Sequence, residues 1–273
     1  MHRQKTRYLS FTDSGIRSEN QDHFIARTFE DEALRDMNRG ELFAVADGMG
    51  GHRAGREAAL EACNRLSDAY FRPDYVFDAD SPEATEIFLK TLFKEINLHL
   101  EKTGQENTDR LGWGCTLSAL VIREKTYVFA HAGDTRIYHF RRDGSQQITE
   151  DQNMAYQMYK SAETTYEEYL TGGGHNVLLS YMGQGKGISI ETGNGKLEPG
   201  DIFMICSDGL NQFADSHHME PVLMRKMPRD SRIDEQLRYL YGTLTKNLIR
   251  VEKARDNVTF ALIGVEHDSE HDF

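Results

Sequence analysis

The sequence predicts an α+β fold in which antiparallel sheets are covered by helices. Short apolar or alternating segments recur at the spacing of hairpins. The helical stretches come in pairs, one pair near the start of the chain and one near its end. No Gly/Ser-rich or Pro-rich linker and no internal repeat divides the chain. A doubly wound parallel sheet would instead alternate strands and helices one by one.

Length allows one large domain or two small ones, and the charge balance argues against some partners. The 273 residues are enough for a sizeable core, and we expect a single domain over residues 1–273 with its core at about 7–265 and an acidic tail at 266–273. With 32 basic and 44 acidic residues, the net charge of −12 argues against nucleic acid or an anionic membrane as a partner. No signal peptide and no long apolar run is visible, so we expect a cytoplasmic protein. Three cysteines lie among apolar residues, which predicts reduced core thiols: Cys63, Cys115 and Cys206.

The first half of the chain holds two predicted helices among strands. Strands are expected at 7–12, 23–28, 42–46, 114–122 and 126–131, the last two joined by a turn at 123–125. From Arg53 to about Phe71 the apolar positions recur at helical spacing, namely Ala54, Ala58, Ala62, Leu66 and Ala69, widened by Leu60 and Cys63. Pro82 suits the first turn of a second helix that runs to about Thr103. Its apolar face would be Ile87, Leu89, Leu92, Phe93, Ile96 and Leu100.

The second half predicts further strands and a second pair of helices. Strands are expected at 135–141, 188–192, 202–207 and 258–265, turns at 142–145 and 199–201, and helices at about 215–225 and 232–252. Residues 149–186 fit no regular element throughout. They contain the glycine triplet 172–174 and five tyrosines, which are Tyr156, Tyr159, Tyr166, Tyr169 and Tyr181.

The predicted strand 42–46 leads directly into the most informative stretch, Asp47-Gly48-Met49-Gly50-Gly51. A carboxylate at the end of a rigid strand, beside a backbone without side chains, suits a metal ion. The carbonyl of Gly48 can turn toward the same ion, because glycine adopts backbone angles that other residues avoid. The alternative is a tight turn from strand to helix that happens to contain an aspartate.

Three other aspartates share this context. Asp208 follows the apolar strand 202–207, Asp256 precedes the strand 258–265, and Asp134 lies between two strands in Gly133-Asp134-Thr135-Arg136. Ends of strands can converge at one edge of a core, so carboxylates distant in sequence can meet. Oxygen ligands suit Mg(II) or Mn(II), and no His or Cys spacing suits zinc. Each aspartate alone also fits ordinary turn chemistry.

These motifs, in this order, resemble the metal-dependent protein phosphatases (the PPM family, type 2C serine/threonine phosphatases) in their bacterial single-domain form. The matching stretches cover about residues 7–265 and are Gly15-Ile-Arg17-Ser-Glu-Asn20-Gln21-Asp22, Val45-Ala-Asp47-Gly48-Met49-Gly50-Gly51-His52, Gly114-Cys115-Thr116, Gly133-Asp134-Thr135-Arg136-Ile-Tyr138, Ile148-Thr149-Glu150-Asp151, Cys206-Ser207-Asp208-Gly209-Leu210 and Asp256-Asn257-Val258-Thr259. The resemblance implies a four-layer α-β-β-α sandwich of two antiparallel sheets flanked by helices. It also implies hydrolysis of phosphoserine and phosphothreonine.

The resemblance assigns roles residue by residue. Two Mn(II) or Mg(II) ions would be bridged by Asp47, with the Gly48 carbonyl on one ion and Asp208 and Asp256 completing the other. Asp22 would act in the outer shell, Asp134 would contribute to a third, weaker ion, and Arg17 would hold the substrate phosphate. A hydroxide between the ions would attack phosphorus without a covalent enzyme intermediate. The implied partners are phosphorylated protein substrates of a serine/threonine kinase, and we expect a monomer. Without the motif, Arg17 would be a solvated loop charge.

Three positions depart from the family pattern. Met49 stands where animal members have a histidine proposed as general acid, so protonation of the leaving group falls to metal-bound water. Cys115 stands in place of Thr or Ser, and Gln152 in place of a histidine, which leaves that stretch without a role. Residues 153–186 correspond to the family's flap, whose tyrosines would either contact substrate or pack on the core. A catalytically silent binding or sensor domain and a hydrolase of small phosphate esters stay open as alternatives.

Overall fold

The computed structural model describes residues 6–31, 37, 39–50, 52–107, 110, 112–210, 227–228, 231–250 and 254–266, without the side chains of 52–53 and 247–250. The predicted helix at 215–225 and all but the first residue of the acidic tail lie outside these residues. Among the described helices, none is long and apolar enough to be a membrane span.

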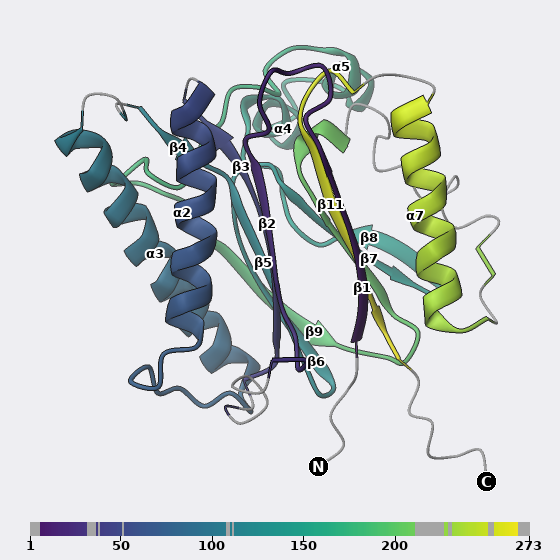
Figure 1. Ribbon diagram of the computed structural model, residues 1–273. Coiled ribbons are helices and arrows are strands. Elements are labelled where there is room, and N and C mark those ends of the chain that lie inside the picture. The colour runs from purple at the N-terminus through teal and green to yellow at the C-terminus, as the bar shows by residue number, and fades with distance from the viewer. Residues whose placement is uncertain are drawn as a thin grey trace, which may run out of the picture.

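Two antiparallel sheets form the centre of the molecule (Figure 1). One has the strand order β1-β11-β10-β7-β8, with β1 at Thr6–Asp13, β11 at Val258–Val265, β10 at Ile202–Cys206, β7 at Arg136–Arg141 and β8 at Gly144–Gln147. The other has the order β2-β3-β5-β6-β9, with β2 at Asp22–Arg27, β3 at Glu41–Met49, β5 at Leu117–Arg123, β6 at Thr126–Ala132 and β9 at Glu191–Lys196. The short β4, Gly114–Cys115, pairs with the end of β3.

The strand residues alternate between two buried faces, which explains their continuous apolar runs. In β3, Leu42 and Ala44 face the helices while Phe43 and Val45 face the second sheet. Strands buried on both faces read as unbroken hydrophobic segments, although this arrangement is better known from parallel sheets. Phe203, in the opposite sheet, belongs to the same inter-sheet core as Phe43.

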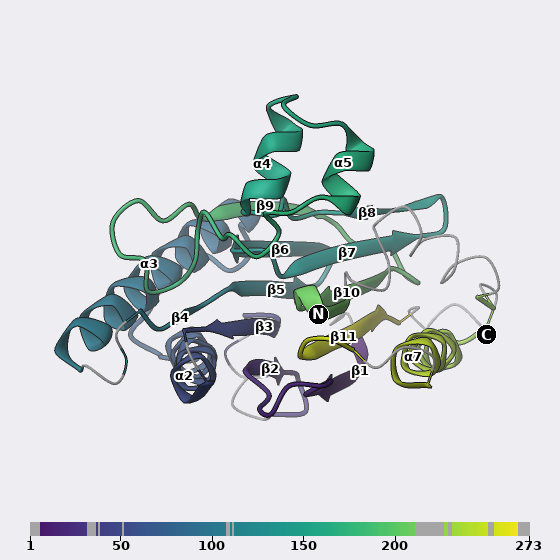
Figure 2. The same cartoon turned by 90° about the horizontal axis from the view of Figure 1, so that it is seen from above.

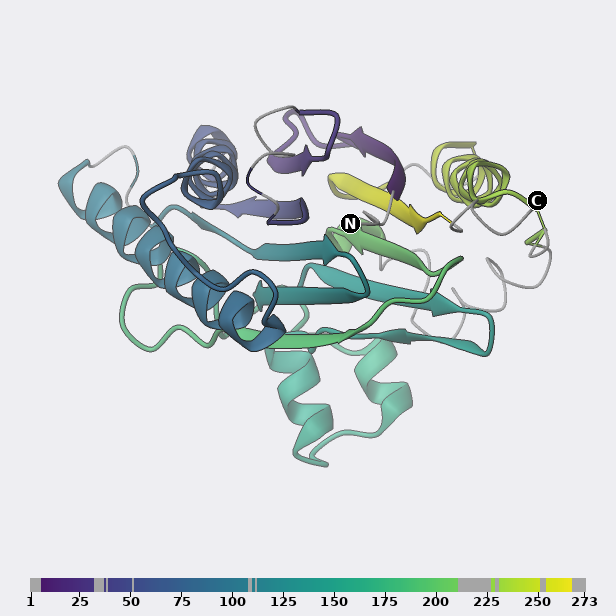
Figure 3. The same cartoon turned by 90° about the horizontal axis from the view of Figure 1, so that it is seen from below.

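Helices cover the outer faces and complete four layers. Figures 2 and 3 show α2 and α3 on the outer side of the sheet that contains β3, and α7 on the outer side of the sheet that contains β11. Their bounds are His52–Tyr70 for α2, Pro82–Glu106 for α3 and Ile233–Arg250 for α7. Helix α3 begins where Ser81 accepts a hydrogen bond from the amide of Ala84 (3.1 Å) and Pro82 occupies the first turn, as the sequence predicted.

Two further helices stand away from the sheets. Figures 2 and 3 show α4, Met154–Lys160, and α5, Tyr166–Thr171, as a pair that projects from the edge where β8 and β9 lie. Asn153 and Thr165 cap their N-termini. We call residues 153–186 the flap.

The structure corrects several expectations. The strand predicted at 188–192 is wrong in position, because β9 spans 191–196 and is an edge strand whose Gly193 and Gly195 lie against aromatic rings of β6. Strand β8 was missed, since its sequence Gly-Ser-Gln-Gln has no apolar alternation. Ile87 is 68% exposed and Leu60 is 40% exposed, so neither belongs to a buried helix face. The three cysteines are buried and free, as predicted.

Candidate metal and phosphate site

The predicted site residues lie at one end of the sandwich. Figure 1 shows the β1–β2 loop, the end of β3, the start of β11 and the flap helices at the same end of the sheets. Here the turn Asp208–Leu210, a short 3-10 helix, follows β10. Strands from both sheets therefore deliver their ends to a common region.

Asp22 and Asp47 are brought together by the register of the first sheet. The two residues are direct partners in the β2–β3 pair. The hydroxyl of Ser207 donates to Asp22 Oδ2 over 2.7 Å and accepts from the amide of Thr259 over 2.9 Å. Ser207, at the end of β10, thus ties the second sheet to Asp22 of the first.

The sequence predicts Asp47 at the end of its strand, but in the structure Asp47 lies inside strand β3. β3 continues to Met49 because Gly48 and Met49 pair with β4. The amide of Asp47 donates to Thr116 Oγ1 (3.0 Å), and the amide of Thr116 donates to the Asp47 carbonyl (2.8 Å). A Cβ at position 48 would lie 2.1 Å from the Gly55 carbonyl oxygen, so only glycine fits where β3 passes α2.

Asp208 and Asp256 are held side by side by the start of β11. A Cβ on Gly209 would lie 1.9 Å from the carbonyl oxygen of Asn257, so glycine lets the two segments touch. The buried amide of Asn257 donates to the carbonyls of Ser14 (3.0 Å) and Glu19 (2.9 Å). Its Oδ1 also accepts from the backbone amide of residue 21 over 2.8 Å. One asparagine therefore fixes the β1–β2 loop against β11.

Arg17 lies on that loop and already has an anionic partner. Its Nη2 donates to Asp256 Oδ2 over 2.8 Å, in a pair that is open to solvent. Gly15 has φ +60°, and a Cβ there would lie 2.3 Å from the Asp256 carbonyl oxygen. The amide of Ile16 donates to the Ala254 carbonyl over 2.9 Å. The loop that carries Arg17 is thus fitted to the chain just before β11.

Asp134 is held by the start of the flap. Asn153 Nδ2 donates to Asp134 Oδ2 at 3.4 Å. The backbone amide of Gln152 donates to the Gly133 carbonyl (2.7 Å), and the side-chain Oε1 of Gln152 accepts from the Gly133 amide (3.0 Å). Gln152 therefore fixes the chain just before the flap to the residue that precedes Asp134.

The carboxylates raise one another's pKa. Burial raises the pKa of Asp22 to about 7, a rise to which the charge of Asp208 adds, whereas the hydrogen bond from Ser207 lowers it. Burial, and then the charges of Asp22, Asp208 and Asp134, raise the pKa of Asp47 well above its ordinary value. Burial and Asp256 raise the pKa of Asp208. Five carboxylates, those of Asp22, Asp47, Asp134, Asp208 and Asp256, therefore each lie within electrostatic reach of at least one other.

Divalent cations fit this donor set. Asp22 Oδ1 and Asp208 Oδ1 are buried and have no hydrogen-bond partner among the described residues. Oxygen donors of excess negative charge are what Mg(II) and Mn(II) prefer. Within the described part of the chain, no three His, Cys, Asp or Glu side chains are already arranged as a finished ligand set. The carboxylates are neighbours, but their grouping as ligands stays a prediction.

Three positioning residues carry no assignment from sequence reasoning: Ser207, Asn257 and Gln152. Two of them lie inside quoted motifs, and the signal was their position next to an aspartate. Their roles depend on contacts between segments more than 100 residues apart in two cases, which no local pattern reveals. Four of the five tyrosines of the flap pack on one another: Tyr156, Tyr159, Tyr166 and Tyr169.

Known proteins are similar to this chain over most of its length. A family model described as protein phosphatase 2C matches residues 18–240. The serine/threonine phosphatase Stp of Listeria innocua is 30% identical over 224 residues, which cover 82% of this chain and 85% of that protein. The crystal structure of the serine/threonine phosphatase Stp1 from Staphylococcus aureus has a TM-score of 0.79 at 26% identity, with 96% of each chain covered.

A more distant likeness concerns the fold alone. The catalytic domain of the phosphatase PstP, solved in complex with two manganese ions, is 23% identical with a TM-score of 0.71, over 96% of this chain and 99% of that chain. The matches confirm the predicted α+β sandwich and the predicted class of enzyme, a phosphoprotein phosphatase. The chain belongs to the protein phosphatase 2C family.

Proposed function

We propose that this phosphatase removes phosphate from phosphoserine and phosphothreonine in proteins with Mn(II) or Mg(II) held by Asp47, the Gly48 carbonyl, Asp208 and Asp256. The observation that carries the proposal is the gathering of mutually repelling carboxylates, two of which have a buried oxygen without a hydrogen-bond partner among the described residues. Metal dependence is typical of the family. Bound divalent cations would activate water as the nucleophile and neutralise the charge of the phosphoryl group.

Asp22 and Asp134 belong to the surroundings of these ligands. Asp22 keeps one oxygen on Ser207 and has the other without a partner among the described residues, which suits a group that holds ordered water. Asp134 lies toward the flap and is held through Asn153, which suits a third, weaker cation at that side of the site. These two roles are proposed from position and from the family resemblance.

Arg17 is the proposed phosphate-binding residue. A guanidinium offers a planar fork of donors to two phosphate oxygens. Its contact with Asp256 among the described residues uses one N–H of Nη2, which leaves Nε, Nη1 and the second N–H of Nη2 for the substrate. Asp256 would then orient Arg17 as well as bind metal.

Exposed apolar side chains beside the site favour a peptide over a small phosphate ester. Ile16, next to Arg17, is 62% exposed, and Val177 in the flap is 50% exposed. Met154 and Leu179 are also exposed and lie beside Val177, since the Met154 amide donates to the Val177 carbonyl over 2.9 Å. Apolar groups at this position can contact residues that flank a phosphoserine or phosphothreonine.

We further propose that the chain acts as one domain and as a monomer in the cytoplasm on the phosphorylated products of a serine/threonine kinase. Its net charge of −12 disfavours nucleic acid and anionic membranes as partners. The metals and Arg17 would attract the phosphate locally despite this overall charge.

A metal titration with two substrates tests the proposed function. Hydrolysis of a phosphothreonine peptide is expected to require Mn(II) or Mg(II) and to stop with EDTA. Hydrolysis of p-nitrophenyl phosphate without hydrolysis of phosphopeptides would indicate an enzyme for small esters. No hydrolysis of either substrate at saturating Mn(II) would indicate a silent binding domain, and turnover unaffected by EDTA would contradict the metal site.

A further inference from the structure

A buried ion pair connects the Asp134 region with the flap. Arg136 Nε donates to Asp151 Oδ1 over 2.8 Å, and Arg136 Nη2 donates to Asp151 Oδ2, so the contact is bidentate. Arg136 is 6% exposed and Asp151 is 4% exposed. Arg136 Nη1 also donates to the hydroxyl of Tyr138 over 3.1 Å. A buried pair with a bidentate contact is held in one geometry. We call it the Arg136–Asp151 platform.

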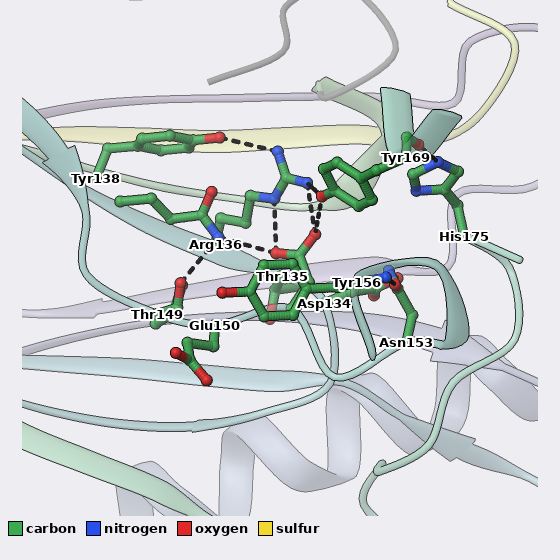
Figure 4. Close-up of polar contacts among 12 residues, drawn as sticks. Asp134, Thr135, Arg136, Tyr138, Thr149, Glu150, Asn153, Tyr156, Tyr169 and His175 are labelled. Atoms are coloured by element: carbon green, nitrogen blue, oxygen red, sulfur yellow. Dashed lines mark hydrogen bonds and ion pairs between the residues drawn. The ribbon is translucent and has the colours of Figure 1, made fainter. Parts of the chain in front are cut away.

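The hydroxyl of Tyr169, on α5, sits on this platform. It accepts from Arg136 Nη2 over 3.2 Å and donates to Asp151 Oδ2 over 3.3 Å, so it uses both of its hydrogen-bonding capacities. Figure 4 shows Tyr169 and Tyr138 approaching the Arg136 guanidinium from opposite sides. A hydroxyl that bridges two charged groups makes stronger hydrogen bonds than one between neutral groups.

Tyr169 is also at the centre of the packing within the flap. Its ring stacks on Tyr159 (centroids 5.4 Å apart, planes 23° apart) and meets Tyr156 edge-on at 6.0 Å. His175 Nε2 lies 2.7 Å from the Tyr169 carbonyl oxygen (Figure 4). The ring therefore holds α4 against α5, while the hydroxyl holds the pair of helices to the body of the protein.

Both members of the platform are close in sequence to residues that link the flap with the candidate site. Arg136 follows Asp134 by two residues, and Asp151 precedes Asn153 by two. Asn153 both caps α4, by accepting from the Tyr156 amide (3.0 Å), and donates to Asp134. Loss of the hydrogen bonds of the Tyr169 hydroxyl would therefore also change the position of the flap next to Asp134.

We propose that Tyr169 is a positioning residue whose hydroxyl latches the flap to the Arg136–Asp151 pair and so sets the place of the flap's apolar residues beside a bound phosphopeptide. The second half of this statement rests on the proposed function; the latch itself does not. Because a small aryl phosphate would not reach the flap, the latch should matter for peptides and not for p-nitrophenyl phosphate.

The test compares Tyr169→Phe with Tyr159→Phe. The first keeps the ring and removes the bridging hydroxyl. The second removes a hydroxyl from the same cluster at a side chain that is 37% exposed and whose hydroxyl contacts neither member of the ion pair. Amide hydrogen exchange is measured over residues 154–178 and over β10 and β11, and KM and kcat are measured with a phosphothreonine peptide and with p-nitrophenyl phosphate.

In Tyr169→Phe we expect exchange in α4 and α5 to quicken about tenfold or more, with β10 and β11 unchanged. We also expect a severalfold rise in KM for the peptide, with kcat for p-nitrophenyl phosphate as in the parent protein. Tyr159→Phe should match the parent in each measurement. These three results together support the proposal.

Unchanged exchange in α4 and α5 of Tyr169→Phe overturns the latch. Equal quickening in β10 and β11, or in the Tyr159→Phe flap, also overturns it, because the hydroxyl would then act on general stability or packing. Faster exchange with an unchanged peptide KM overturns the positioning role. If the parent protein cleaves no phosphopeptide, the proposed function fails, while the exchange experiment still decides on the latch.

Discussion

Asp208 is a buried carboxylate that is unfavourable for the fold and that we propose as a metal ligand. Its Oδ1 is buried without a partner among the described residues, and its pKa is raised by burial and by Asp256. Burying such a group is unfavourable unless something compensates the charge. The proposed compensation is a divalent cation, which the fold alone does not supply.

Replacement of Asp208 by asparagine should separate these two effects. We expect Asp208→Asn to abolish Mn(II)-dependent hydrolysis, because the amide lacks the ligand charge. The variant should melt no lower than the parent in EDTA, because a source of repulsion has been removed. Steady-state assays and thermal unfolding measure both, with Asp68→Asn on the exposed side of α2 as the matched control. Near-normal activity of Asp208→Asn would refute the metal assignment.

The proposed phosphate-binding role of Arg17 can be tested with two substitutions, one that removes the side chain and one that keeps its charge but changes its shape. Arg17→Ala should mainly raise KM for a phosphopeptide, since it removes binding of the phosphate that is present before and during reaction. Arg17→Lys should recover part of the loss, because an ammonium keeps the charge but lacks the planar fork. A KM that is the same in parent and Arg17→Ala would count against the phosphate role.

At the scale of elements, the β1–β2 loop is placed by Asn257 at the start of β11. Asn257→Ala removes three hydrogen bonds from a buried side chain and leaves two loop carbonyls and one amide without that partner. We expect a loss of about 1–3 kcal/mol in the free energy of unfolding. We also expect a higher KM for a phosphopeptide, because Arg17 lies on this loop.

Denaturant unfolding and steady-state kinetics measure both effects of Asn257→Ala. Asn257→Asp is the informative control, since it keeps the acceptor for the amide of residue 21 and loses both donors. It should be no more stable than Asn257→Ala, because its buried carboxylate would face the carbonyl oxygens of Ser14 and Glu19. Equal stability of all three proteins would mean that the loop is held by other contacts.

The elements that could be predicted from sequence are those whose pattern follows from their own burial. Strands β3, β10 and β11 are buried on both faces, and their sequences are apolar runs. The start of α3 is predicted by the capping residue Ser81 and by Pro82 in the first turn. β8 and β9 could not be predicted, because an edge strand of glycine and polar residues is stabilised by its partner strand alone. The short helices of the flap are stabilised mainly by tyrosine packing between them, which has no local periodicity.

The residues of the site can likewise be divided into those that the sequence predicts and those whose contacts depend on the fold. Asp47, Asp208 and Asp256 stand out because each lies next to an apolar strand and a turn residue. The meeting of Asp22 with Asp47 depends on the register of β2 and β3, and the contact of Arg17 with Asp256 joins positions 239 residues apart. Only the folded chain reveals these pairings.

At the scale of the whole molecule, the acidic site makes stability depend on pH and metal. The pKa of Asp22 is about 7 in the folded protein and near 3.8 when unfolded, so the folded state binds more protons between these values. The stability that Asp22 contributes is fully present below the lower value and is lost as pH rises through the upper one. His131, whose pKa burial lowers to about 4, acts in the opposite direction between that pH and 6.5.

A comparison with Asp22→Asn isolates the aspartate from the histidine. In EDTA, the free energy of unfolding of the parent should fall relative to that of Asp22→Asn between about pH 5 and about pH 7.5. Saturating Mn(II) at the higher pH should stabilise the parent, because a ligand that binds only the folded state shifts the equilibrium toward it. Parallel pH profiles of the two proteins in EDTA would contradict the raised pKa of Asp22.

Carboxylates from both sheets are proposed to bind the divalent cations together. Anomalous diffraction from crystals soaked in Mn(II) tests this proposal most directly. We expect manganese peaks between Asp47, Asp208 and Asp256, with carboxylate oxygens within coordination distance. Well-ordered carboxylates with no manganese between them, at a Mn(II) concentration that supports hydrolysis, would contradict it.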